Sequence, residues 1–410
     1  MSKEKKILPK LRFPEFAEDG EWILSTIGEL GDFYYGKSAP KWSLSEDAPT
    51  LCVRYGELYT KFGTVISEIF SRTNIEPSNL RFSKGGEVLI PRVGEDPYGF
   101  ANCSYLPFPN IAIGEMISVY ETDEHPIFFA YYFNTLKKQF AKVVEGQNVK
   151  NLYYVNLEPI EVGKPLKLAE QKKIAACLSS LDELIAAHIK KLDALKDYKK
   201  GLLQNLFPKD GQKVPNYRFP EFKRDRGWKE RKLGDKQISS FVSEKIDSDE
   251  LTLNNYISTD NMIAEYSGIT KASKLPKTNR VTKYIEGDIL ISNIRPYLKK
   301  VWKSDRKGGA SNDVLVFRSG SEITIDFLEA ILKNDAFIKY VMKSAKGLKM
   351  PRGDKSSILK YPIRIPQLKE QRKIASCLSI VDEIIASQAN RIEQLQLHKQ
   401  GLMQGLFPKI

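Results

Sequence analysis

The amino-acid sequence predicts an α+β protein in which two mixed α/β domains are joined by two long helices. We expect these helices to pack antiparallel as a coiled coil, with a pseudo-two-fold internal repeat. A segment of 42 residues occurs twice, at 168–209 and 368–409, with 22 identities and no gaps. The pentapeptide RFPEF precedes each half, at 12–16 and 218–222. Because a long repeat fixes the architecture, the predicted parts are domains at 1–165 and 209–365 and helical spacers at 166–208 and 366–410.

Length and composition indicate a globular protein with more than one core. The 410 residues are 41% hydrophobic and 28% charged, and a single core stops growing at about 250–300 residues. No run reaches the roughly 18 uncharged apolar residues of a membrane span, so we expect a cytoplasmic protein without a membrane partner. Four cysteines without CxxC spacing and three histidines argue against a disulfide framework or a zinc site. The formal net charge of +13 favours polyanionic partners.

The repeated segments predict long helices, the first over about 170–203, because their apolar residues recur at alternating steps of four and three. The seam residues are Ile174, Leu178, Leu181, Ile185, Leu192 and Leu195 in the first copy, and Ile374, Leu378, Val381, Ile385, Ile392 and Leu395 in the second. Polar residues interrupt the seam at His188, Lys199, Gln388 and Lys399, and such residues can fix register. A helix of about 34 residues is a rod of about 50 Å. Two rods packed antiparallel would bury both seams, although ordinary core helices remain the alternative.

The variable segments predict mixed α/β domains. Runs rich in β-branched residues predict strands at 87–93, 117–121, 288–294 and 313–318. Apolar residues at helical spacing predict one helix at 127–140 and one at 326–343. Each helix leads into a basic loop, at 145–151 in the first half and 345–355 in the second.

Basic and amide side chains at these loops and after the strands suit phosphates and base edges. Between residues 271 and 307 there are 11 Lys or Arg and 3 Asp or Glu, interleaved with aromatic residues. The predicted DNA-binding residues are Arg92, Gln147, Asn148 and Lys150 in the first half, and Asn293, Arg295, Lys299, Lys300, Trp302, Lys349 and Arg352 in the second. For each residue taken singly, a solvated basic surface is the alternative.

Motifs for catalysis are absent from the sequence: it has no GxxxxGK[ST] loop, HExxH, GxSxG elbow or GxGxxG after a strand. Asp96, Pro97 and Tyr98 are similar to part of the acidic, proline, aromatic loop of adenine methyltransferases, but the second proline and an upstream cofactor loop are missing. Acid–lysine pairs such as Asp354 with Lys355 are not joined by further carboxylates that would hold a metal. We therefore expect no catalytic site, no cofactor and no metal in this chain.

The chain resembles the specificity (S) subunits of type I restriction-modification systems over nearly its whole length. The resemblance rests on two copies of EQxKIAxCLSxxDExI, at 170–185 and 370–385, on the GLxQxLFPK endings and on RFPEF. It implies two target recognition domains that read a bipartite double-stranded DNA site. It also implies two modification (M) subunits that methylate adenine N6 and restriction (R) subunits that translocate and cleave DNA.

Two other classes of protein remain possible from the sequence. A self-contained DNA-modifying enzyme with an unrecognised site would modify DNA by itself. A coiled-coil adaptor with basic domains would bind RNA or anionic membranes in preference to duplex DNA. The divergence of the two variable halves favours different half-sites, because two identical readers would require a palindrome.

Overall fold

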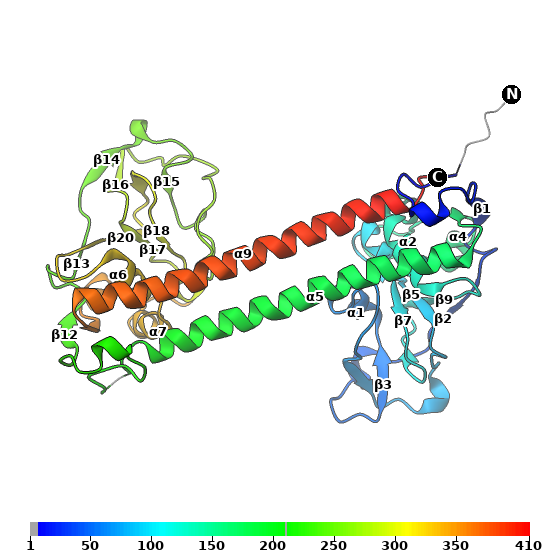
Figure 1. The fold of residues 1–410 in the computed structure, drawn as a ribbon, viewed down its shortest axis with the longest axis horizontal. Helices are drawn as coiled ribbons and strands as arrows, with labels where there is room; N and C mark the ends of the chain where they lie inside the picture. The colour runs from blue at the N-terminus through cyan, green and yellow to red at the C-terminus, as the bar shows by residue number, and fades with distance from the viewer. Residues whose placement is uncertain (1–6, 210) are drawn as a thin grey trace. The chain divides into compact units, whose positions relative to one another are not determined.

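A computed structural model describes residues 7–209 and 211–410 as two compact units. The first unit contains residues up to 190 together with 390–410, and the second contains residues 191–389. The division falls inside both long helices, α5 (Leu168–Asn205) and α9 (Leu368–Leu406), which Figure 1 shows as uninterrupted ribbons. Each unit thus contains the first part of one long helix and the last part of the other. The predicted α+β fold is confirmed.

The first unit is built on a four-stranded antiparallel sheet in the order β2-β9-β5-β7. Its strands are β2 (Asp32–Tyr35), β9 (Ile117–Glu121), β5 (Glu87–Pro91) and β7 (Ser104–Leu106). A smaller sheet has the order β4-β3-β8, and two pairs complete the strands, β1 with β11 and β10 with β6. These elements are β3 (Thr50–Val53), β4 (Ser71–Thr73), β8 (Ala112–Ile113), β1 (Ile23–Thr26), β11 (Glu161–Lys164), β6 (Val93–Gly94), β10 (Lys150–Asn151), and the helices α1 (Tyr55–Thr60) and α4 (Tyr154–Leu157).

The second unit repeats this plan with a four-stranded antiparallel sheet in the order β13-β20-β17-β18. Its strands are β13 (Ser239–Phe241), β20 (Val314–Ser319), β17 (Ile289–Ser292) and β18 (Val301–Lys303). The remaining elements are β14 (Lys245–Asp247), β16 (Arg280–Tyr284), β19 (Gly308–Ala310) and β15 (Tyr256–Ile257) in one sheet, the pair β12 (Lys229–Lys232) and β21 (Pro362–Ile365), and helix α8 (Lys355–Leu359). The similar peptides GEVLI (86–90) and GDILI (287–291) provide β5 and β17, which are inner strands of the sheets β2-β9-β5-β7 and β13-β20-β17-β18.

The prediction of one helix after each large sheet was wrong, because both segments are divided. The first forms α2 (Pro126–Thr135) and α3 (Lys137–Lys142), and the second forms α6 (Ile325–Leu332) and α7 (Asp335–Lys343). The Asn134 side chain accepts from the Cys103 amide at 2.7 Å, and that of Asn334 caps α7 by accepting from the Ala336 amide at 2.9 Å. Asn334 thereby starts a new helix, whereas Asn134 lies inside α2 and the first break follows at Leu136, so apolar periodicity alone does not predict the breaks.

The long helices run antiparallel within each unit. In the first unit, the Lys399 ammonium lies 2.5 and 2.7 Å from the two carboxylate oxygens of Asp182. In the second unit, Lys199 lies 2.5 Å from Asp382. Both ion pairs join the first half of one helix to the last third of the other. The two lysines are polar seam residues, and they occupy equivalent positions in the repeat.

The repeated LFPK ending enters the core of the opposite half of the sequence. Phe407, at the end of α9, stacks on Tyr132 of the first unit with ring centres 4.8 Å apart. Phe207, at the end of α5, stacks on Phe327 of the second unit at 5.3 Å. Both leucines before these phenylalanines are buried. The identity of the two endings therefore follows from equivalent packing in the two cores.

Candidate nucleic-acid interface

A buried ion pair fixes the start of each long helix to the RFPEF peptide of its own half. Arg12 donates to both carboxylate oxygens of Glu170 at 2.8 Å, and Trp22 Nε1 donates to the same carboxylate at 3.3 Å. In the second unit Arg218 binds Glu370 at 2.8 and 2.7 Å, joined by the indole of Trp228 at 3.2 Å. We call each set of three residues a clasp. The sequence repeated all six residues but gave no indication that they contact one another.

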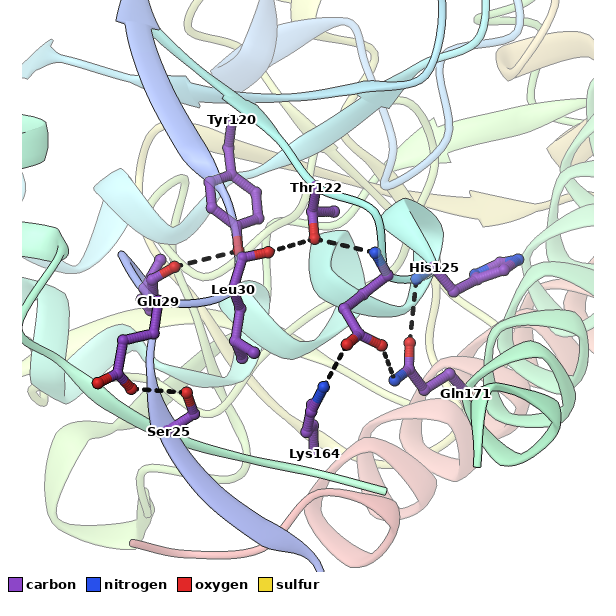
Figure 2. Close-up of polar contacts among 10 residues, drawn as sticks. Ser25, Glu29, Leu30, Tyr120, Thr122, His125, Lys164 and Gln171 are labelled. Atoms are coloured by element: carbon purple, nitrogen blue, oxygen red, sulfur yellow. Dashed lines mark hydrogen bonds and ion pairs between the residues drawn. The ribbon is translucent and has the colours of Figure 1, made fainter. Parts of the chain in front are cut away.

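The glutamine that follows each clasp glutamate orients a helix of the domain. Figure 2 shows Gln171 reaching the residues before α2: its Oε1 accepts from the His125 amide at 3.0 Å and its Nε2 donates to Glu124 at 2.7 Å. Gln371 likewise accepts from the Thr324 amide at 2.9 Å. His125 and Thr324 are the N-cap residues of α2 and α6. The repeated EQ dipeptide thus holds each long helix and its domain together.

An equivalent backbone junction in each unit brings the predicted DNA-binding segments together. In the first unit the Leu152 amide donates to the Arg92 carbonyl at 2.8 Å, and in the second the Gly353 amide donates to the Asn293 carbonyl at 3.2 Å. Arg92 directly follows β5, and Asn293 directly follows β17. The end of an inner strand, β5 or β17, therefore meets the basic loop in both units.

Both basic loops are hairpins closed by the same pair of backbone bonds. Glu145 and Asn151 exchange bonds of 2.9 and 2.8 Å, and Lys346 and Arg352 exchange two bonds of 2.9 Å. Each hairpin turns at its second residue, a glycine with φ of 98° or 100°, where other residues are disfavoured. The tips of the two loops are exposed.

In the first unit the predicted residues differ in how they are held. Gln147 and Asn148 are exposed at the loop tip. Lys150 is half-buried, and its ammonium donates to the Gln147 carbonyl at 2.8 Å. Arg92 is half-buried between Tyr35 and Tyr153. The two tyrosines were not among the predicted residues.

In the second unit, four predicted residues are buried or bound within the domain. The Asn293 side chain is only 8% exposed. Lys299 forms ion pairs with Asp335 at 3.0 Å and Glu265 at 3.5 Å. The ammonium of Lys300 donates to a backbone carbonyl, that of residue 259, at 2.7 Å. Trp302 packs against the core beside a tyrosine ring.

Three other predicted residues of the second unit present their side chains to solvent. Arg295 and Lys349 are exposed, and Arg352 is exposed with an ion pair of 3.1 Å to Asp313. The Arg295 backbone has φ of 51°, a left-handed conformation that is uncommon outside glycine. Three further lysines of the basic run, Lys271, Lys274 and Lys277, line a surface hollow of about 360 Å³.

The twelve seam residues are all buried or half-buried. Eight are below 9% exposed: Ile174, Leu178, Ile185, Ile374, Leu378, Val381, Ile392 and Leu395. The other four, Leu181, Leu192, Leu195 and Ile385, are half-buried.

Among residues 7–209 and 211–410, no group of three or more His, Cys, Asp or Glu side chains is placed to hold a metal ion. In the same ranges, no helix is long and apolar enough to cross a membrane.

Residues 83–197 and 225–397 match the family model described as the type I restriction modification DNA specificity domain. The two matches together cover well over half of the chain, with one in each repeat. The chain belongs to this family. It is a type I restriction-modification specificity subunit with DNA-recognition domains, and its role in the system is DNA recognition and not catalysis.

Individual relatives agree with this assignment. The type I restriction enzyme MjaVIII specificity subunit of Methanocaldococcus jannaschii is 26% identical over 297 residues, which are 67% of this chain and 68% of the relative. The crystal structure of the S subunit of a type I system from M. genitalium has a TM-score of 0.62 at 16% identity, covering 98% of this chain and 100% of that one. A chain from a structure described as the basis of complex assembly and conformational transition of the type I R-M system has a TM-score of 0.58 at 15% identity, covering 93% and 96%. These structures share the fold of the specificity subunit.

Proposed function

We propose that the specificity subunit reads a bipartite, gapped DNA site, with one recognition domain on each half-site. The observation that carries this proposal is the junction described above, which has the same backbone in both domains and different side chains. Arg92 corresponds to Asn293, and Tyr153 corresponds to Asp354, each of which directly follows the residue that donates the junction hydrogen bond. Because base recognition depends on the side chains that reach the groove, equivalent surfaces with different residues favour an asymmetric site.

The helices α5 and α9 are proposed to set the length of the unread gap. Each helix begins in one unit and ends in the other, and a lysine interrupts the seam at the same repeat position in both copies. Domains held at a fixed separation meet one face of the duplex about a helical turn apart, and the bases between them go unread.

We further propose that two M subunits dock on this subunit, together with R subunits. Each long helix exposes an apolar residue at the same repeat position, Leu184 at 42% and Ile384 at 44%. The exposed neighbours Glu183 and Glu383 are identical. Two matching surfaces on one chain suit two copies of one partner. The methylation of adenine N6 would then belong to the M subunits, and translocation and cleavage to the R subunits, in the cytoplasm.

The experiment that tests the proposed function is to express the chain with the M subunit of its own operon in a host without adenine methylation. Single-molecule sequencing then maps N6-methyladenine across the genome. We expect one gapped, asymmetric motif that disappears when this chain is omitted.

Other results would contradict specific parts of the proposal. An ungapped motif would exclude the two-domain reading. Methylation by the purified chain alone would indicate a self-contained enzyme. A soluble complex without methylation, combined with a gel shift that favours RNA or anionic vesicles over duplex DNA, would support a coiled-coil adaptor.

A further inference from the structure

The side chain of Arg92 is held between two aromatic rings at the junction of the first domain. Its guanidinium carbon lies 4.7 Å from the centre of the Tyr35 ring and 5.8 Å from that of Tyr153. The Tyr35 ring is itself supported by Tyr154, whose centre is 4.6 Å away, and Tyr154 stacks on Phe33 at 5.5 Å. Arginine stacks on aromatic faces in this manner and so loses little freedom when it binds a ligand.

The hydrogen-bonding capacity of Arg92 is not used within the described part of the chain. Its Nε is buried without a hydrogen-bond partner, and the side chain forms no ion pair with any residue of 7–209 or 211–410. Most arginines at a comparable depth in this protein bind a carboxylate, as Arg12 and Arg218 do. A buried donor left without a partner is costly. Arg92 is therefore oriented for a ligand that the chain does not supply.

We propose that Arg92 is a specificity-determining residue of the first domain that recognises a guanine, with Tyr35 and Tyr153 as positioning residues. This proposal rests on the proposed function. A guanidinium matches the O6 and N7 acceptors of guanine in the major groove with two parallel hydrogen bonds. Exposed lysines around the basic loops, such as Lys349, can bind phosphates as point charges, which leaves the fixed, planar guanidinium of Arg92 to recognise a base edge.

The second domain has no equivalent of this arrangement. Asn293 occupies the position of Arg92, and its Oδ1 is likewise buried without a hydrogen-bond partner, but it faces Gly353 of its own domain, where a Cβ would lie 2.9 Å from that oxygen. Asp354 replaces Tyr153, so the ring that would cover the guanidinium is absent. Guanine recognition by this route is therefore confined to one half-site. Variants of Arg92 should change that half-site and leave the other unchanged.

The test is to map N6-methyladenine motifs for the complex with the M subunit, comparing wild type with Arg92→Lys, Tyr153→Ala and Tyr153→Phe. Arg92→Lys keeps the positive charge but loses the bidentate contact with guanine O6 and N7. We expect it to relax one G·C pair of one half-site, with discrimination reduced roughly 5- to 150-fold, while the other half-site is unchanged. Tyr153→Ala should relax the same pair, and Tyr153→Phe, which keeps the ring, should preserve it.

Lys138→Ala removes an exposed positive charge on α3 that is not one of the junction residues, and serves as the control for a simple loss of charge. If Arg92→Lys leaves the motif unchanged, or lowers methylation equally at all sites without altering the motif, the proposal is wrong. Failure of the wild-type complex to give a gapped motif would instead refute the proposed function.

Discussion

Arg12 and Glu170 lie 158 residues apart in the sequence, yet they form a two-point ion pair at 2.8 Å that is almost completely buried, with exposed side-chain fractions of 10% and 1%. Arg218 and Glu370 form the same pair in the second unit, with fractions of 9% and 1%. The clasps explain why RFPEF and the EQ dipeptide are repeated while the sequence between them diverges. Recognition surfaces can vary on a frame whose attachment to the long helices is constant.

Replacement of Arg12 by methionine should destabilise the first unit. Glu170 would remain buried with only the Trp22 indole as a partner, and breaking a buried pair from one side costs about 3–5 kcal/mol. Thermal unfolding should show the loss of stability. Amide hydrogen exchange should locate this loss in residues of the first unit. The double variant Arg12→Met with Glu170→Met should recover part of the stability, because no charge is then left buried.

The matched variant Arg218→Met provides the control, since it should weaken the second unit instead. Equal loss of protection in both units for either single variant would show that the clasps do not act locally.

The N-cap of α2 should make the first unit sensitive to acid. His125 Nδ1 accepts from the Phe128 amide at 3.4 Å, and burial, followed by the nearby charge of Lys172, lowers the pKa of this histidine below its usual value of 6.5. Between the folded and unfolded pKa values the unfolded chain binds more protons, so stability falls as the pH drops below about 6.5. The loss is complete once the pH is below the folded pKa.

Replacement of His125 by threonine copies the cap of α6, where Thr324 Oγ1 accepts from the Phe327 amide and does not titrate. The difference in melting temperature between pH 7.5 and pH 5 should be smaller for His125→Thr than for wild type. Parallel curves for the two proteins would show that this histidine makes no contribution to the acid sensitivity.

Apolar periodicity in the repeated segments made the long helices predictable, and runs of β-branched residues made the strands predictable. The strand predicted at 117–121 coincides with β9, and the first long helix extends two residues beyond the predicted range at each end. The breaks at Leu136 and Asn334 were not predictable from apolar spacing, and the second depends on a side chain that caps the backbone.

The candidate interface was less predictable than the fold. Arg92 was identified from its residue type and its place after a strand, but Tyr35 and Tyr153 reach it only through strand pairing and the Leu152 junction. Asn293 illustrates the opposite case, because an amide suited to base edges is buried in the domain. Residue type indicates what a side chain can bind, whereas its exposure depends on the packing of distant segments.

Replacement of Arg295 by glycine should make the second unit more stable and its binding to DNA weaker. Its left-handed backbone, with φ of 51°, costs an ordinary residue about 1–2 kcal/mol. Arg295→Gly should therefore raise the free energy of unfolding of the second unit by about 1 kcal/mol. The hydrogen bond that the backbone amide of residue 295 donates to the Pro351 carbonyl is retained in this variant. Fluorescence anisotropy with a duplex carrying the mapped motif should show weaker binding.

The dependence of this loss on sequence identifies the contact. A loss that is uniform across sequences, with a smaller salt dependence, would indicate a phosphate contact, and relaxation at one base pair would indicate direct readout. Unchanged affinity would remove Arg295 from the interface.

Matched deletions in the two long helices should change the length of the unread gap. Asp182 pairs with Lys399 in the first unit and Lys199 with Asp382 in the second, so removal of 187–193 from α5 and of 388–394 from α9 preserves both pairs and the phase of the heptad seam, at the loss of Leu192 and Ile392. Seven residues correspond to about 10 Å of helix, or about three base pairs at roughly 3.4 Å each. Motif mapping should show a gap about three base pairs shorter, or no methylation if the altered phase prevents both domains from binding together.

A deletion in α5 alone mismatches the helices and should reduce the stability of the chain. If the matched deletions keep full activity with an unchanged gap, the helices do not determine the spacing, and the recognition domains must reach their half-sites independently of helix length.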